Sequence, residues 1–136
     1  MMEMTDIEAK ENNYPEIAGL EHVYLEDSYV ISLRFDKNNL CFKLLLVLSE
    51  QHELYSPPKI GEQYCYRNAT LNFKNPLEVQ WNSISMMPIT DANYSIDFGN
   101  IDFLSMVENQ YHISGDWGEV VFQCNTVELE IEQSTE

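Results

Sequence analysis

Apolar and polar residues alternate with a period of two along most of the chain after Ile17, a pattern that predicts β-strands rather than helices. In the segment 29–35 one phase holds the large apolar side chains, and we expect this phase to be buried: Tyr29, Ile31, Leu33 and Phe35. The polar residues 36–39 predict a turn, and the apolar run 40–48 predicts the second strand of an antiparallel hairpin.

Breaks in the alternation predict the connections. A short strand is expected at 20–25, with Glu26 and Asp27 forming the turn that follows. The segment 56–61 contains two adjacent prolines, which lack backbone donors, so it is expected at the surface. Within 63–73 the apolar phase changes by one residue near Asn68, which predicts a β-bulge there.

The second half of the chain follows the same pattern. Further strands are expected at 77–82, around 111–113, at 120–124 and at 127–131. Gly115–Gly118 predicts a tight turn or a bulge, and a second phase change after Asn125 predicts another bulge. A long irregular connection is expected between Ser83 and Asn100, and the pattern does not decide the structure of 101–106.

Seven or eight short antiparallel strands with few helices predict an all-β fold, either a β-sandwich or a partly open barrel. The chain of 136 residues has the length of one domain. We expect this domain to span 17–132, between an acidic, poorly ordered tail at 1–16 and a short tail at 133–136.

Composition excludes several classes of protein. Hydrophobic residues make up 44% of the chain, which is too many for intrinsic disorder. Its three cysteines form no Cys-x-x-Cys pair and are expected to act as small apolar side chains. The N-terminus lacks the basic start of a signal peptide, and the longest apolar run is far shorter than the ~20 residues of a membrane span. We therefore expect a cytoplasmic protein.

Charge is distributed unevenly along the chain. The formal net charge is −16, and the last lysine or arginine is Lys74. Residues 1–74 carry a net charge of −5, whereas residues 75–136 carry −11. A one-sided negative field attracts cationic partners, so a basic protein is expected as partner. Nucleic acid and anionic membrane are disfavoured.

The last predicted strand has three alternating glutamates, which we call the comb: Glu128, Glu130 and Glu132. Their carboxylates are expected ~7 Å apart on one face. Such a row either binds lysine and arginine side chains of a partner or is a solvated face that protects an edge strand from pairing. The sequence favours neither interpretation over the other.

Other polar groups support weaker hypotheses. The segment 91–102 has five oxygen-bearing side chains, which suit calcium but are also common in turns: Asp91, Asn93, Asp97, Asn100 and Asp102. The aromatic residues suit a carbohydrate site, but at alternate positions they are more often core residues: Tyr64, Tyr66, Trp81, Tyr111 and Trp117. The three histidines are scattered and none has a partner evident from the sequence, so no catalytic residue, metal site or cofactor is assigned.

The segment Tyr111–Phe122 (YHISGDWGEVVF) resembles the closing hairpin of small acidic β-rich bacterial proteins. Some proteins of that kind are similar to immunity proteins of contact-dependent toxin systems. The resemblance transfers no functional residue to this chain.

The leading hypothesis is an acidic module that docks on a basic protein and neutralises it, as an immunity-type inhibitor or a phosphate mimic would. The contact residues expected are Glu128, Glu130, Glu132, Asp97, Asp102 and Asp116, with Trp117 as an anchor if it is exposed. Two alternatives remain. One is a calcium-dependent or carbohydrate-binding module, and the other is an assembly subunit that pairs through an edge strand at 63–73. The oligomeric state is left open.

Overall fold

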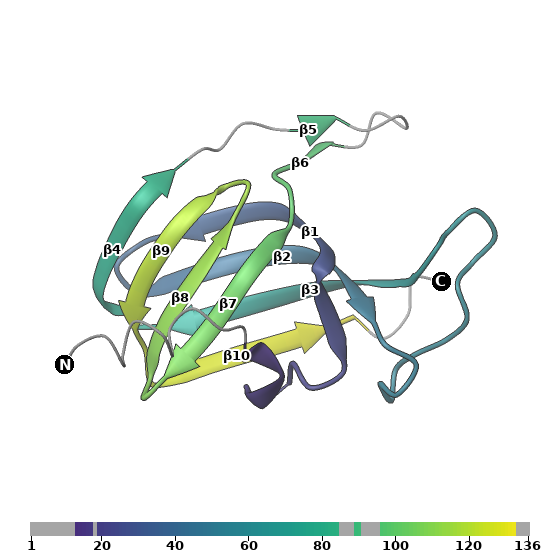
Figure 1. The fold of residues 1–136 in the computed structure, drawn as a ribbon, viewed down its shortest axis with the longest axis horizontal. Helices are drawn as coiled ribbons and strands as arrows, with labels where there is room; N and C mark the ends of the chain where they lie inside the picture. The colour runs from purple at the N-terminus through teal and green to yellow at the C-terminus, as the bar shows by residue number, and fades with distance from the viewer. Residues whose placement is uncertain (1–12, 18, 85–88, 91–95, 133–136) are drawn as a thin grey trace.

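The computed structural model describes residues 13–17, 19–84, 89–90 and 96–132. These residues form two antiparallel β-sheets that pack face to face, with most of the apolar side chains between them (Figure 1). The fold is all-β and is a β-sandwich, as the sequence predicts, and the strands form two separate sheets rather than a closed barrel.

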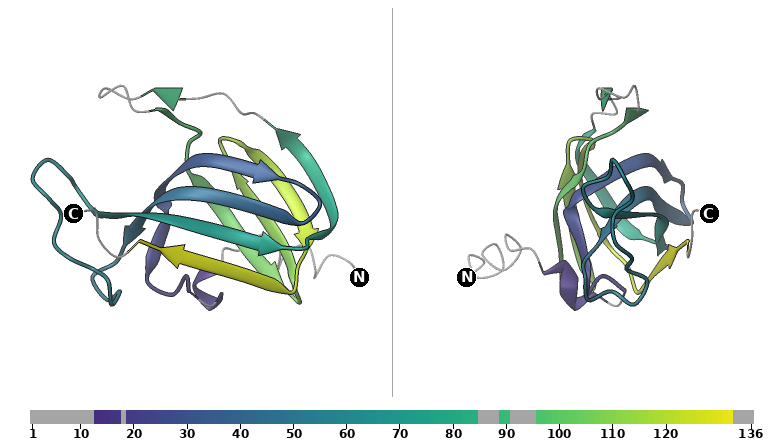
Figure 2. Two further views of the ribbon diagram at one scale, coloured as in Figure 1. Left: turned by 180° about the vertical axis from the view of Figure 1, so that it is seen from behind. Right: turned by 90° about the vertical axis from the view of Figure 1, so that its right-hand side faces the viewer.

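Each large sheet has four strands. Sheet A has the order β1-β2-β3-β10: β1 (Val23–Phe35), β2 (Asn39–Leu48), β3 (Cys65–Lys74) and β10 (Thr126–Ile131). Sheet B has the order β4-β9-β8-β7: β4 (Leu77–Ile84), β9 (Gly118–Gln123), β8 (Gln110–Gly115) and β7 (Ile101–Val107). Sheet A faces the viewer in the left view of Figure 2, with sheet B behind it.

The chain changes sheet at two short connections that lie close together. It leaves sheet A between β3 and β4, and it returns between β9 and β10. The Sγ atom of Cys124 contacts both connections, at 3.1 Å from the carbonyl oxygen of Lys74 and 3.1 Å from that of Thr126. The bulge predicted after Asn125 is wrong, because the phase change there marks the crossing from one sheet to the other.

Aromatic rings from both sheets meet in the core. Phe73 lies 5.0 Å from Tyr111 and 5.0 Å from Phe122 between ring centroids, and 6.2 Å from Phe42. All four rings are buried, and they join one sheet to the other. Burial of this apolar area is the main favourable term in the folding of such a domain.

The predicted phase of the first long strand is wrong for three of its four residues, whereas Leu33 packs against the core as predicted. Val30 is completely buried, whereas Tyr29, Ile31 and Phe35 are 39–43% exposed. β1 is a single strand that bends where its register to β2 shifts, between Tyr24 and Tyr29 and again between Val30 and Ser32. The predicted turn at Glu26–Asp27 lies within this bend. An edge strand with two irregularities can expose its larger residues, and alternation alone does not show which phase is buried.

The bulge predicted at Asn68 is also wrong. β3 pairs with β2 without interruption from Lys74 to Cys65, and every second residue of β3 faces the core. One of these is Arg67, whose guanidinium donates to the Leu54 carbonyl at 3.0 Å and to the Ser56 hydroxyl at 3.1 Å. A buried arginine interrupts the apolar pattern, so the alternation in this segment resembles that of a strand with a bulge. The guanidinium anchors the loop between β2 and β3 to the sheet.

The predicted N-terminal tail is partly ordered. Residues Tyr14–Glu16 form a short 3₁₀ helix (η1), and Tyr14 is buried. The Tyr14 hydroxyl donates to Glu26 at 2.7 Å, and the Asn13 side chain bonds both backbone groups of Met106 in β7. Burial and the Glu26 carboxylate raise the pKa of Tyr14 well above its usual range. These contacts fix the start of the domain against both sheets.

The predicted long connection contains a small two-stranded ladder. β5 (Ile89–Thr90) pairs with β6 (Ile96–Asp97). The chain then joins the edge of sheet A, where Phe98 donates its backbone N–H to Val30 at 2.8 Å and Val30 donates to Gly99 at 2.7 Å. The described residues contain no helix with the length and hydropathy that a membrane span requires.

Candidate acidic binding surface

The comb lies on the outer face of sheet A. In β10 the residues Val127, Leu129 and Ile131 pack toward the core, so the alternating glutamates point outward. Glu128 pairs in register with Asn72, and Glu130 with Thr70. Beyond the strand, the backbone N–H of Glu132 donates to the Asn68 carbonyl at 2.9 Å. The prediction that the comb glutamates share one face is therefore confirmed.

Basic residues on the same face offset the comb. Lys74 lies 3.3 Å from Glu128, in an ion pair in which both side chains are about half exposed. Lys43 of β2 is in register with Thr70, which is itself in register with Glu130. The strands of sheet A carry four acids and four bases, of which Arg67 faces the core: Glu26, Asp27, Glu128, Glu130, Arg34, Lys43, Arg67 and Lys74. The comb is thus embedded in a face of mixed charge.

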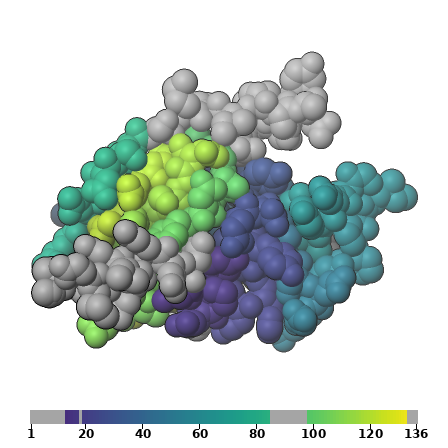
Figure 3. All heavy atoms as spheres, in the orientation of Figure 1, coloured from purple at the N-terminus to yellow at the C-terminus, as the bar shows by residue number. Residues whose placement is uncertain are grey.

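Sheet B differs from sheet A in charge. All of its strands lie within 77–123, beyond the last lysine or arginine of the sequence. Its strands and hairpin turns carry five acids and no such base: Glu78, Asp102, Glu108, Asp116 and Glu119. Sheet B occupies much of the face seen in Figure 3. Because sheet B is built from the part of the chain without lysine or arginine, it is more negative than sheet A.

Two of the predicted contact residues meet at one end of sheet B. Asp102 lies at an irregularity of β7, opposite the β8–β9 turn that contains Asp116. Partial burial raises the pKa of Asp102 above its usual range, and the nearby Asp116 carboxylate raises it further. Asp116 packs so closely on Gly99 that a methyl group at this glycine would overlap the carboxylate.

The bend of β1 carries two more exposed acids, Glu26 and Asp27, and a hydrogen bond joins it to the segment before β7. Asn100 donates from its side-chain amide to the Glu26 carbonyl at 2.6 Å, which ties the segment before β7 to the bend. We call the resulting group of exposed carboxylates the acidic edge: Glu26, Asp27, Asp102 and Asp116. It joins residues from both halves of the sequence and from both sheets, and the comb lies apart from it on β10, at the opposite edge of sheet A from β1.

The remaining predicted contact residues are placed differently. Asp97 lies in β6, and its side chain falls outside the described part of the structure. Trp117 is completely buried, with its ring centroid 5.2 Å from Phe42 and 6.4 Å from Trp81. The prediction that Trp117 is a surface anchor is therefore wrong. The turn after Gly115 directs the indole inward, where it fills the space between the sheets.

Sheet B contains a histidine–glutamate pair that was not predicted from the sequence. His112 of β8 and Glu119 of β9 approach to 2.5 Å between Nε2 and Oε2, on the outer face of sheet B. His112 also packs edge-on against Phe103, at 5.0 Å between ring centroids. This pair could have been predicted from a turn at Gly115–Gly118. The register that such a turn sets places Glu119 diagonally opposite His112.

Of the five side chains in the calcium hypothesis, those of Asn100 and Asp102 lie within the described residues. Asp91 and Asn93 lie outside the described residues, and so does the side chain of Asp97. Asn100 uses its side-chain amide to bond Glu26. In the part of the chain that the structure describes, no three His, Cys, Asp or Glu side chains are grouped so that they could hold a metal ion.

The edge strand proposed for assembly is an interior strand. β3 is hydrogen-bonded to β2 on one side and to β10 on the other. Its backbone groups are therefore already paired along both edges. The hypothesis that residues 63–73 pair with another chain is wrong.

Comparison with known proteins found no family model, no curated protein and no solved structure that matches this chain.

Proposed function

We propose that this protein binds a basic protein partner through the acidic edge and neutralises it, in the manner of an immunity-type inhibitor or a phosphate mimic. The observation that carries the proposal is the distribution of charge between the sheets. The strands of sheet A carry four acids and four bases, whereas the strands and hairpin turns of sheet B carry five acids and no lysine or arginine. The acidic edge adds the carboxylates of the β1 bend to two of these acids.

The geometry of the acidic edge suits recognition of a cationic cleft. Its four side chains are exposed, although the Glu26 carboxylate also accepts a hydrogen bond from the Tyr14 hydroxyl. They stand on strands and a tight turn that the Asn100–Glu26 and Val30–Gly99 hydrogen bonds hold together. Proteins that act on nucleic acids carry positive clefts, and fixed carboxylates compete with phosphates for such a cleft. We place this interaction in the cytoplasm.

Repulsion within the acidic edge also favours binding. Partial burial raises the pKa of Asp102, and the Asp116 carboxylate raises it further by repulsion. A lysine or arginine placed between them relieves this repulsion, so part of the binding free energy comes from strain in the free protein.

The test compares two variants that each lose three charges. Asp27→Asn/Asp102→Asn/Asp116→Asn removes three of the four charges of the acidic edge, and Glu128→Gln/Glu130→Gln/Glu132→Gln removes all three charges of the comb. Each variant and the wild-type protein are immobilised, exposed to lysate of the source organism, and eluted with a salt gradient, after which mass spectrometry identifies the eluted proteins. Circular dichroism confirms that both variants are folded.

We expect one basic protein to elute at high salt from the wild-type protein and from the comb variant, and to be lost from the acidic-edge variant. Equal retention by the acidic-edge variant would contradict the proposal. Loss from the comb variant alone would move the contact to the outer face of sheet A.

A further inference from the structure

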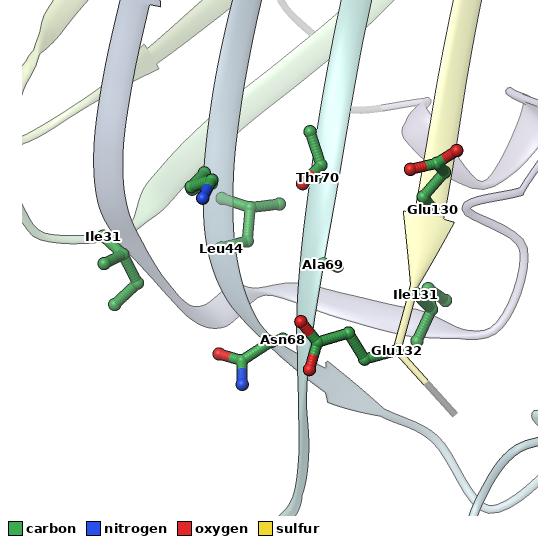
Figure 4. Close-up of a pocket in the computed structure, with 9 residues that line it drawn as sticks. Ile31, Leu44, Asn68, Ala69, Thr70, Glu130, Ile131 and Glu132 are labelled. Carbon is green, nitrogen blue, oxygen red and sulfur yellow. The ribbon is translucent and has the colours of Figure 1, made fainter. Parts of the chain in front are cut away.

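The outer face of sheet A has a groove that the proposed function does not use. The groove has a volume of about 530 Å³ and crosses all four strands, from Ile31 of β1 to Glu130 of β10 (Figure 4). Leu44 and Ala69, whose side chains are almost completely buried, contribute to its floor. Small-molecule sites in proteins have volumes of about 300–1,000 Å³, so the groove has the size of a ligand site.

The polar side chains of the groove carry both donors and acceptors. Lys43 supplies an ammonium group, Glu130 and Glu132 supply carboxylates, and Asn68 and Thr70 can both donate and accept. Within the described part of the chain, these five side chains form no hydrogen bond or ion pair with one another or with their neighbours. Water satisfies them in the free protein, and a ligand with suitably placed polar groups can replace that water.

Tyrosine rings continue the same face beyond Asn68. Tyr29 is in register with Leu45, which is in register with Asn68, so Tyr29 belongs to the same row across the sheet. Tyr66 lies two residues before Asn68 on the same face of β3, with its ring centroid 6.3 Å from that of Tyr29 and 6.1 Å from that of Tyr64. Partly exposed rings offer flat apolar surfaces beside the polar groove.

The balance of these groups selects the class of ligand. Two carboxylates repel a phosphate or another anion, and the Lys43 ammonium offsets one of them and so weakens the attraction of a polycation. A neutral chain of hydroxyl groups matches the mixture of donors and acceptors, and its apolar C–H faces match the tyrosine rings. An open groove also leaves one side of the ligand in water, which a hydroxylated molecule tolerates.

We propose that the outer face of sheet A binds a neutral oligosaccharide, with the polar residues of the groove bonding its hydroxyl groups and the Tyr29–Tyr66 pair stacking on a sugar ring. This site is separate from the acidic edge, and it does not depend on the proposed function.

The test is a titration of the ¹⁵N-labelled protein with four soluble hexasaccharides, built from β-1,4-glucose, α-1,4-glucose, β-1,3-glucose and β-1,4-xylose units. Amide chemical shifts are followed by NMR up to millimolar sugar. We expect at least one sugar to shift the amides of Lys43, Asn68–Thr70 and Glu130. High salt should leave this affinity unchanged, because the ligand is neutral. The binding of a basic protein, by contrast, should weaken.

Variants separate the groove from the rest of the face. Asn68→Ala removes a donor and an acceptor, and it should weaken binding by about tenfold, the effect of losing roughly one hydrogen bond. Lys43→Met keeps the apolar stem and should weaken binding similarly, which covers the case in which Asn68→Ala does not fold. Glu128→Gln lies outside the groove and should leave the affinity unchanged.

Three results would overturn the proposal. One is that none of the four sugars shifts the groove amides at millimolar concentration. Another is that the shifted amides lie elsewhere on the molecule. The third is that Asn68→Ala and Lys43→Met both bind the sugar as well as the wild-type protein does. None of these results bears on the acidic edge.

Discussion

Alanine substitutions at two neighbouring residues of β1 can show which face of this strand is buried. Val30 is completely buried and Ile31 is 41% exposed, although alternation predicts the opposite phase. Val30→Ala removes two buried methyl groups, each worth about 0.8 kcal/mol in transfer, and leaves a cavity, so we expect a loss of about 2–3 kcal/mol in unfolding free energy. Ile31→Ala removes more atoms, but they are partly in water, and we expect a loss of only about 1 kcal/mol.

Urea denaturation of both variants, followed by circular dichroism, measures these losses. The backbone hydrogen bonds of Val30 to Phe98 and Gly99 do not involve its side chain, so the alanine variant keeps them. The dependence of unfolding free energy on urea should be the same in both variants, which shows that the compared states are equivalent. If Ile31→Ala costs as much as Val30→Ala or more, the assigned face of β1 is wrong.

Three further predictions concern charge. Asp116→Asn should bring the pKa of Asp102 down toward its usual range in NMR titrations. Because a raised carboxyl pKa makes ionisation cost stability as pH rises, this variant should be more stable than the wild-type protein at neutral pH, by up to about 1 kcal/mol. The gain should vanish below the usual aspartate pKa, and a gain that persists in acid would contradict the electrostatic explanation. The melting temperature of the wild-type protein should rise from low to physiological salt, since counterions screen a net charge of −16; a flat or falling value would contradict this. Glu128→Gln should cost less than about 1 kcal/mol in urea denaturation, because the Lys74–Glu128 pair is exposed, and a larger loss would show a structural role for the comb.

Several elements of the fold are predictable from the sequence. The hairpin of β1 and β2 follows from two apolar runs and the polar segment between them, where Asp36 accepts backbone hydrogen bonds from Asn38 and Asn39 at 2.8 and 3.0 Å. The outward direction of the comb follows from strict alternation in β10. In these places local pattern and tertiary packing agree, so the sequence is sufficient.

Other features depend on contacts between distant parts of the chain. The buried face of β1 depends on its place at a sheet edge and on the segment 98–99 that bonds it. Arg67 is polar yet faces inward, because loop carbonyl and hydroxyl groups satisfy most of its guanidinium. The alternation of apolar and polar residues along the sequence does not reveal contacts of this kind.

The candidate surface shows the same limit. The sequence supplies the count of acids, but it does not say that the comb shares its sheet with Lys43 and Lys74, or that Asn100 bonds the β1 bend to the segment before Asp102. That separation arises from two crossings between sheets, at 75–76 and 124–125. The His112–Glu119 pair is the exception, since the predicted turn already implies its register.

The most direct test of the central claim is the association rate constant of the retained basic protein, measured by stopped flow across a range of salt concentrations. The wild-type protein and the comb variant should associate rapidly at low salt and slow steeply as salt rises. The acidic-edge variant should associate roughly tenfold more slowly at low salt, with a much weaker salt dependence. Equal rates and equal salt dependence for the acidic-edge variant and the wild-type protein would contradict the claim that this surface recognises the partner.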